Sequence, residues 1–240
     1  MSNEVREFWD ERAREDAFYF VDNTGRYRDP DQYRFWASGE ETLERMLDLL
    51  GVSLAADDDV VEVGCGLGRM TRALASRCGT VHGVDVSPEM VARARRLNSH
   101  LENVEWIVGD GRSLASIPDE SADVAHSHVV FQHIPDPEVT LGYVREMGRV
   151  LRGGGFAFFG ISNAPEIHRR RPLTSRVRLG LKTALGRGPR GQSDPAWLGS
   201  HIEIASLRAA AAEANAEIER LEGEGTQYCL VLMRKRADRQ

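Results

Sequence analysis

Short runs of apolar and β-branched residues alternate with longer stretches of helical periodicity from about residue 38 onward. Runs of the first kind predict buried strands, and stretches of the second kind predict amphipathic helices. Because the two alternate along the chain, the pattern indicates βαβ units stacked around a parallel sheet. The predicted strands are residues 59–63, 80–86, 104–109, 122–130, 155–161, 217–222 and 227–233.

Capping residues mark where several of the predicted helices begin and end. Ser38 and Glu41 have the spacing of a capping box in front of an apolar stretch, and Gly51 ends that helix. Residues 87–89, Ser-Pro-Glu, combine a capping hydroxyl, a proline at the first helical position and an acid in the first turn. Further helices are predicted near Met70 and Leu74, across residues 137–151 and near Leu207.

The composition is that of an ordinary globular protein, since 41% of the 240 residues are hydrophobic and 28% are charged. No run reaches the roughly 18 apolar residues of a membrane span, and the charged N-terminal stretch lacks the apolar core of a signal peptide. We therefore expect a cytoplasmic protein without a membrane span, either a monomer or a homodimer. Cys65, Cys78 and Cys229 form no CxxC pair, which argues against a metal site and against a disulfide framework.

Charge is distributed unevenly along the chain. The net charge of −6 gives no reason to expect a nucleic acid as a partner. Between residues 168 and 190 the basic residues occur without an acid among them. They are Arg169, Arg170, Arg171, Arg176, Arg178, Lys182, Arg187 and Arg190. This segment is either a solvated loop or a surface that attracts an anionic acceptor.

The segment VVEVGCGLG, residues 60–68, leads from a β-branched run into glycines at positions 64, 66 and 68. Glycines in such a loop allow a ligand to approach the backbone closely. The G-x-G-x-G spacing differs from the G-x-G-x-x-G of dinucleotide-binding folds, because Arg69 stands where the third glycine would be. No Gly-Lys-Ser/Thr follows, so a Walker loop is excluded.

Two acids mark the ends of the next predicted strands, Asp85 at the second and Asp110 at the third. In a parallel sheet both lie along the carboxyl edge, beside the loop that follows the first strand. Carboxylates and bare backbone along one crevice suit a ligand with a sugar diol, an amino-purine and a charged tail. The same set suits a pyrophosphate poorly.

Five segments closely resemble the successive motifs of class I S-adenosylmethionine-dependent methyltransferases, in the small-molecule branch labelled methyltransferase type 11 or UbiE-like. They are VVEVGCGLGRMTRALA, VHGVDVSPEMVARAR, NVEWIVGDGRSL, SADVAHSHVVFQHIPD and REMGRVLRGGGFAFFG. The resemblance covers residues 38–162 densely and the last two strands by pattern. It implies an α/β Rossmann-like fold, with a seven-stranded, mostly parallel sheet of order 3-2-1-4-5-7-6. The last strand is then antiparallel, and helices cover both faces.

The resemblance implies S-adenosylmethionine as the cofactor. The cofactor-binding residues that it implies are Glu62, Gly64, Gly66, Arg69, Asp85, Val86, Met90, Asp110, Gly111, Ser127 and His128. Among them, Asp85 would accept from the ribose hydroxyls and Asp110 from the adenine amino group. Glu62 either orients the glycine loop or contacts the cofactor directly, and Arg69 either reaches the cofactor carboxylate or is an exposed arginine of the first helical turn.

The resemblance implies an enzyme that transfers a methyl group to oxygen, nitrogen or carbon of a small organic acceptor by in-line displacement. Such a reaction needs an aligned lone pair in a site sheltered from water, and it requires neither a metal nor a nucleophilic triad. For a hydroxyl or ammonium acceptor a base of near-neutral pKa helps, which makes His133 the candidate catalytic residue. His133 is either that base or part of the acceptor-binding pocket.

Two regions lie outside the motifs. We assign residues 1–37 to an N-terminal helical and aromatic segment and residues 38–240 to the methyltransferase domain, with residues 163–200 as a basic insertion on the acceptor side. In the first region we predict that Tyr19, Tyr33 and Trp36 cover the cofactor and bind the acceptor. For Phe8 and Trp9, ordinary burial of a docked helix is a sufficient explanation.

Other functions remain compatible with these motifs. A protein with this fold can use bound S-adenosylmethionine for a reaction other than methyl transfer. An RNA methyltransferase is a second alternative through the arginine-rich segment, although the acidic net charge argues against it. The sequence alone does not define the acceptor or the atom that is methylated.

Overall fold

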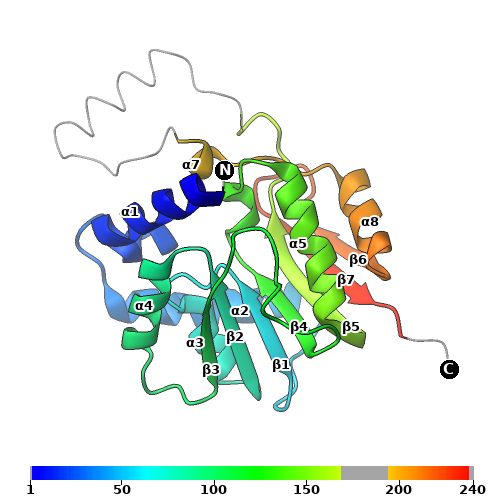
Figure 1. Ribbon diagram of the computed structural model, residues 1–240, viewed down its shortest axis with the longest axis horizontal. Coiled ribbons are helices and arrows are strands. Elements are labelled where there is room, and N and C mark those ends of the chain that lie inside the picture. Colours follow the sequence, from blue (N-terminus) through cyan, green and yellow to red (C-terminus); the bar gives the residue numbers. More distant parts are fainter. Residues whose placement is uncertain (1, 169–193, 238–240) are drawn as a thin grey trace.

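Seven strands form one sheet in the computed structural model, which describes residues 2–168 and 194–237 (Figure 1). Their order is β3-β2-β1-β4-β5-β7-β6. The first five in this order are parallel, and β7 runs antiparallel to both of its neighbours. The strand order and the antiparallel last strand are therefore confirmed. The strands are β1 (Asp59–Val63), β2 (Thr80–Asp85), β3 (Val104–Val108), β4 (Ala122–Ser127), β5 (Leu151–Ile161), β6 (Ala216–Glu222) and β7 (Cys229–Lys235).

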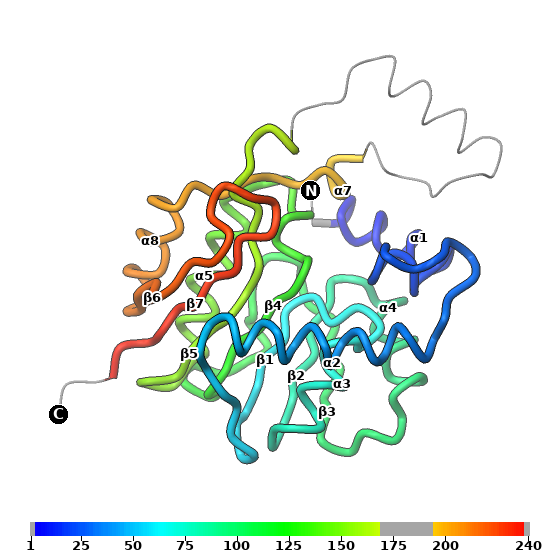
Figure 2. The backbone as a smooth tube through the Cα atoms, turned by 180° about the vertical axis from the view of Figure 1, so that it is seen from behind, coloured from blue at the N-terminus to red at the C-terminus, as the bar shows by residue number. Residues whose placement is uncertain are grey.

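Helices cover both faces of this sheet. They are α1 (Ser2–Val21), α2 (Gln32–Leu50), α3 (Arg69–Ala75), α4 (Pro88–Leu97), the 3-10 turn η1 (Phe131–His133), α5 (Pro137–Val150), α7 (Pro195–Leu198) and α8 (Ile204–Glu213). Successive strand side chains point to opposite faces, so Val60 packs in a cluster with α2 and α3, whereas Val61 packs in a cluster with α5 and α8. Figure 2 shows α2 crossing the face of the sheet that lies behind in Figure 1.

The second helix begins earlier than the sequence pattern predicted. Its N-cap is Asp31, whose carboxylate accepts a hydrogen bond from the backbone N–H of Arg34, while Gly51 ends the helix in a left-handed conformation as predicted. Ser38 lies inside the helix, where its hydroxyl donates to the carbonyl of Phe35. The predicted capping box was therefore wrong, and the boundary drawn after residue 37 falls within α2.

The limits of several strands also differ from the prediction, most of all in the fourth and fifth strands. The fourth strand ends at Ser127, because the next residues turn into η1. The fifth strand begins at Leu151, directly after α5, and not beyond the glycine pair at residues 153–154. Leu151 is fully buried and pairs with Ala122, and an irregularity in the pairing, with extra residues on β5 between Leu151 and Phe156, accommodates the glycines that follow.

The carboxyl edge of the sheet is covered by segments from both ends of the chain. Helix α1 packs on α4, and its Phe20 ring lies 5.6 Å from the ring of Trp197 in α7 (Figures 1 and 2). Asp16 interrupts the helical geometry of α1 with φ −168° and ψ 82°, so the helix bends over this edge. Within residues 2–168 and 194–237, no helix has the length and apolar character needed to cross a membrane. The three cysteines are free and buried.

Candidate active site

The glycine loop after β1 is shaped by side chains that pack against its bare backbone. Gly64 and Gly66 have φ of +78° and +53°, in the left-handed region that favours glycine. A Cβ on Gly64 would lie 2.2 Å from Val130 Cγ2, and one on Gly66 would lie 2.8 Å from Val21 Cγ2. The loop is therefore a cradle without room for side chains, closed by residues from the segment after β4 and from α1.

The third glycine has a packing function. Gly68 is the N-cap of α3 with φ +88°, and a Cβ there would lie 2.5 Å from the indole of Trp106. It thus allows close contact between the start of α3 and the side chain of β3. The shortened spacing moves Arg69 into the first turn of the helix and toward the cavity.

Asp85 joins the glycine loop to the start of α4. Its two carboxylate oxygens accept hydrogen bonds of 2.9 Å from the backbone N–H groups of Gly66 and Ser87. Burial raises the pKa of Asp85 even though these hydrogen bonds lower it. A carboxylate has about four acceptor positions, so Asp85 retains acceptor capacity for a ligand hydroxyl.

Asp110 organises the loop that follows β3. Its carboxylate accepts from the backbone N–H groups of Arg112 and Ser113 and from the Ser113 hydroxyl, each at 2.7 Å. Burial raises the pKa of Asp110, but these hydrogen bonds prevail and hold it below its ordinary value. The flanking Gly109 and Gly111 line the cavity, whereas the Asp110 side chain does not.

Glu62 and Arg69 form the charged floor of the cavity. Glu62 is buried and accepts a 2.5 Å hydrogen bond from the Thr71 hydroxyl, and burial raises its pKa to about 7. Arg69 is only 6% exposed, so it is not the surface arginine that the sequence left open as an alternative.

The Arg69 guanidinium is incompletely satisfied by the protein. Its Nη1 reaches the hydroxyls of Ser38 and Thr42 at 3.3 and 3.4 Å, and its buried Nε has no hydrogen-bond partner among the described residues. A buried cation with orphaned donors fits an anionic ligand group. With the glycine cradle and Asp85, these residues suit an adenosyl cofactor that carries a carboxylate tail.

One cavity brings most of the predicted site residues together. It encloses about 1000 Å³ of empty space, part of which is open to solvent. The predicted residues that line it are Glu62, Gly64, Gly66, Arg69, Asp85, Val86, Met90, Gly111, His128 and His133. Ser127 is not among them; it is buried, and its hydroxyl donates to the carbonyl of Val63 at 2.9 Å.

The segment after β4 carries a strained residue that sequence reasoning missed. Val129 lines the cavity with φ +56°, a conformation that costs a β-branched residue about 1–3 kcal/mol. The neighbouring His128 also lines the cavity, and burial, followed by the charge of Arg69, lowers its pKa to about 3. His128 is therefore neutral at neutral pH. No sequence pattern reveals the backbone conformation of Val129.

His133 presents one ring nitrogen as a hydrogen-bond acceptor. Its Nδ1 lies 2.8 Å from the carbonyl oxygen of Trp197, and because a carbonyl only accepts, Nδ1 carries the proton. The neutral ring then has a lone pair on Nε2, which has no partner in residues 2–168 and 194–237. Burial lowers the pKa of His133, so the neutral form predominates at neutral pH.

The segments on either side of residues 169–193 are fixed to the site by hydrogen bonds. Besides the contact of His133 with Trp197, the hydroxyl of Ser200 donates to the carbonyl of Ile134 at 2.7 Å. His168 donates from Nδ1 to the carbonyl of Leu198 at 2.6 Å. The predictions made for residues 169–190 lie outside the residues that the structure describes.

Helix α1 covers the cavity, but through other residues than predicted. Tyr33 is 84% exposed, Trp36 packs under the Arg72 guanidinium at 3.7 Å, and Tyr19 lies beside Tyr27, so none of the three predicted aromatic residues lines the cavity.

The α1 residues that do line the cavity are Val5, Trp9, Phe20 and Val21. Trp9 lies with its ring 5.8 Å from that of His133, so it is more than a buried residue of a docked helix. The spacing of Val5 and Trp9, four residues apart on one helix face, is the signal that could have found them.

The fold and the cavity define a Rossmann-like protein with a nucleoside-binding crevice at the carboxyl edge of its sheet. Residues 61–159 match the family model described as a methyltransferase domain. Residues 61–159 therefore form a methyltransferase domain, and S-adenosylmethionine is the cofactor that this family indicates.

Relatives and solved structures agree with this family. The ubiquinone biosynthesis O-methyltransferase of Pseudomonas putida is 33% identical over 165 residues, which are 65% of this chain and 66% of that enzyme. The 2-methyl-6-phytyl-1,4-hydroquinone methyltransferase of Synechocystis is 34% identical over 143 residues, 58% of this chain and 44% of that enzyme. A phosphoethanolamine N-methyltransferase from Haemonchus contortus shares the fold, with a TM-score of 0.67 and 16% identity over 98% of this chain and 49% of that structure.

The chain spans less than two thirds of the length of the first curated relatives that it matches. The matched share of those relatives ranges from 32% to 66%. The reaction and the acceptor proposed for this protein therefore rest on the residues of its own cavity.

Proposed function

We propose that the protein transfers the methyl group of S-adenosylmethionine to an oxygen, nitrogen or carbon nucleophile of a small organic acceptor by in-line displacement. The observation that carries this proposal is the shared cavity. Its walls include the glycine cradle and Asp85 as well as the acceptor nitrogen of His133. A cofactor and an acceptor bound there would meet beside a neutral base.

Names of relatives support a small molecule as the acceptor. Relatives of this chain are named for methylation of a ubiquinone precursor, of a phytylhydroquinone and of phosphoethanolamine. Apolar side chains line the cavity near His133, among them Trp9, Phe20 and Ile134. They exclude water from the reacting atoms, and they suit an acceptor of largely organic character.

Each group of the chain has a distinct part in this mechanism. Asp85 would accept from the ribose hydroxyls, and Arg69 would pair with the carboxylate of the methionine moiety. Bound in this way, S-adenosylmethionine supplies an electrophilic methyl group on a sulfonium leaving group. His133 would receive the acceptor's proton at Nε2, because Nδ1 already donates to the carbonyl of Trp197. That hydrogen bond also fixes the plane of the imidazole ring.

Replacing His133 tests the mechanism. We expect His133→Ala to lower kcat by about 100-fold or more, the usual contribution of a positioned base, with the Kd of S-adenosylhomocysteine unchanged. The assay measures acceptor-dependent release of S-adenosylhomocysteine with a panel of quinols, phenols and amines. The matched control is His100→Ala, since His100 is exposed on the surface.

The outcomes separate the competing functions. The proposal is supported if the release of S-adenosylhomocysteine depends on an acceptor and is largely lost in His133→Ala. Unchanged turnover in that variant removes His133 from the mechanism. Consumption of S-adenosylmethionine without a methylated product indicates instead a reaction other than methyl transfer.

A further inference from the structure

Tyr143 presents an unsatisfied hydroxyl to the cavity. It projects from α5 and is only 5% exposed, and its ring stacks on that of Phe131 at 5.7 Å between centroids. Its side chain lines the cavity, yet the phenolic oxygen makes no hydrogen bond to any residue that the structure describes. A phenylalanine would fill the same space against Phe131, so packing does not account for the hydroxyl.

Contacts of α5 show which end of the cavity this hydroxyl faces. Gly142, the preceding residue, approaches the carbonyl of Arg112 closely, since a Cβ on it would lie 3.8 Å from that oxygen. Glu146, three residues further along α5, accepts a hydrogen bond from the backbone N–H of Leu114 at 2.9 Å. Tyr143 therefore lies where α5 packs on the loop that follows Asp110.

Electrostatics give the same position. Burial is the main cause that raises the pKa of the Tyr143 phenol, and the charges of Asp110 and Asp85 raise it further. Both acids lie at the carboxyl ends of neighbouring strands, where the nucleoside part of the cofactor binds. The phenol remains protonated at neutral pH and can donate a hydrogen bond there.

The neighbouring groups favour one kind of ligand atom for this donor. Asp85 lines the cavity as an acceptor and would bind the hydroxyls of the ribose, whereas the loop at Asp110 presents Gly109 and Gly111 to the cavity. The ring nitrogens of adenine are acceptors, and no carboxylate can bind them. The Tyr143 hydroxyl is not among the fully buried atoms that lack a partner, so it is accessible from the cavity and free to donate to a ligand there.

We propose that Tyr143 is a further cofactor-binding residue whose hydroxyl donates a hydrogen bond to a ring nitrogen of the adenine. The proposal rests on the binding of the cofactor in this cavity and not on the identity of the acceptor. It adds to the site a contact from α5, an element for which the sequence offered no binding residue.

Tyr143→Phe removes the hydroxyl and keeps the ring, so the variant is expected to fold. We expect its Kd for S-adenosylhomocysteine to rise about tenfold, as for loss of one buried hydrogen bond. Calorimetry with the 1-deaza, 3-deaza and 7-deaza analogues of S-adenosylhomocysteine identifies the atom. The analogue that lacks the bonded nitrogen binds wild type and variant equally, while the other two retain the difference. The control is Tyr228→Phe, at a tyrosine that is 66% exposed.

Three results would overturn the proposal. An unchanged Kd for S-adenosylhomocysteine in Tyr143→Phe, with an unchanged KM for the acceptor, would mean that the hydroxyl only contacts water. An unchanged Kd with a raised KM for the acceptor would assign the hydroxyl to the acceptor. An equal loss for S-adenosylhomocysteine and all three analogues would place its partner outside the ring nitrogens. Because these measurements need no turnover, failure of the proposed methyl transfer would be seen separately.

Discussion

Glu62 is the residue whose charge depends most directly on conditions near neutral pH. Burial raises the pKa of its carboxyl to about 7, although the hydrogen bond from Thr71 and the charge of Arg69 lower it. A cationic ligand in the cavity favours the ionised carboxylate, because opposite charges attract strongly where water is excluded. Binding of S-adenosylmethionine therefore lowers this pKa and releases a proton.

We predict that the affinity for S-adenosylmethionine rises between pH 6 and pH 8. Below a pKa of about 7, binding must first remove a proton from Glu62, so the Kd at pH 6 exceeds the Kd at pH 8 by about tenfold. Calorimetry in buffers of different ionisation enthalpy measures the Kd and the released proton together. Glu62→Gln has no carboxyl at this position, so its Kd for S-adenosylmethionine should not change with pH. If the Kd of this variant changed with pH as much as that of the wild type, Glu62 would not be the titrating group.

The same carboxyl affects stability with the opposite dependence on pH. Its pKa in the folded protein, about 7, is raised above the ordinary 4.5, so its contribution is present below pH 4.5 and is lost as the pH rises through 7. We therefore expect the unfolding free energy of the cofactor-free wild type to fall relative to that of Glu62→Gln as the pH rises through this range. Urea unfolding at several pH values measures it, and a constant difference would contradict the raised pKa.

At the scale of elements, α1 closes the cavity through two polar contacts. Asp10 accepts hydrogen bonds from the Ser87 hydroxyl at 2.5 Å and from the backbone N–H of Glu89 at 3.1 Å, at the N-terminus of α4. Arg6 donates to the carbonyl of Gly109 at 3.2 Å. Ser87 follows β2 and Gly109 follows β3, so α1 is attached to both loops that flank the nucleoside end of the cavity.

Replacing Asp10 should loosen this closure. We predict that Asp10→Ala raises the Kd of S-adenosylhomocysteine about three- to tenfold, since removal of a carboxylate from a helix N-terminus costs about 1 kcal/mol. Limited proteolysis within α1 should become faster at the same time. The control is Glu7→Ala, which changes an exposed acid on the same helix. Equal affinities in Asp10→Ala and Glu7→Ala would show that the contact does not hold α1 closed.

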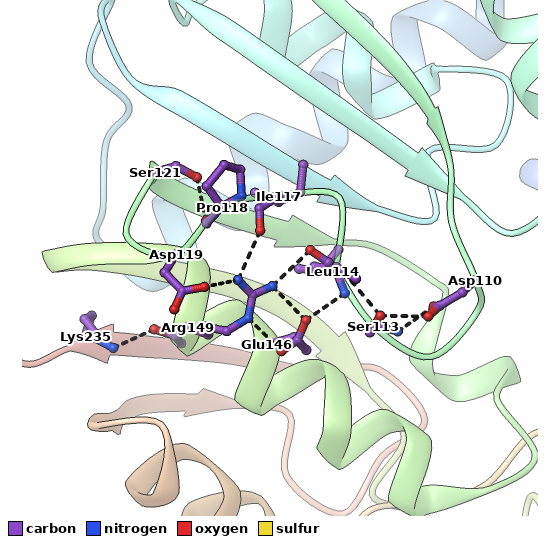
Figure 3. A network of polar contacts seen from close by, with 12 residues as sticks. Asp110, Ser113, Leu114, Ile117, Pro118, Asp119, Ser121, Glu146, Arg149 and Lys235 are labelled. Carbon is purple, nitrogen blue, oxygen red and sulfur yellow. Dashed lines mark hydrogen bonds and ion pairs between the residues drawn. The ribbon is translucent and has the colours of Figure 1, made fainter.

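At the scale of the whole molecule, polar contacts of α5 connect the loop after Asp110 to strand β7 (Figure 3). Arg149 on α5 donates to the carbonyls of Leu114 and Ile117 at 2.9 and 3.0 Å and pairs with Glu146. On the opposite side of the helix end, Lys235 of β7 donates to the carbonyl of Gly148 at 2.7 Å. Helix α5 thus holds the loop after Asp110 against the rest of the fold.

Arg149 should contribute more to the stability of the fold than its partial exposure suggests. We predict that Arg149→Met lowers the unfolding free energy by about 2 kcal/mol, because hydrogen bonds from a charged donor to backbone carbonyls are lost. For a chain of this size the melting temperature falls by about 4–8 °C. Arg145→Met is the control: it breaks the exposed pair with Glu213 and should cost less than about 1 kcal/mol. A similar loss in both variants would refute the role of Arg149.

The sequence predicted the features of the fold that depend on local hydrophobic pattern and on the order of the motifs. Strands such as β1 follow from β-branched runs, and the resemblance supplied their order. The positions of Trp9 and Tyr143 did not follow, because each reaches the cavity from a helix far from the glycine loop in sequence. The start of α2 was missed because Asp31 caps a segment whose aromatic residues have no clear periodicity.

The hydrogen bonds of Trp197 and Ser200 bear on how acceptor preference can diverge. They fasten the chain beyond residue 193 to His133 and Ile134, so the orientation of the His133 ring depends on these two contacts. If His133 is the base of the proposed reaction, a change of acceptor preference has to leave both contacts intact.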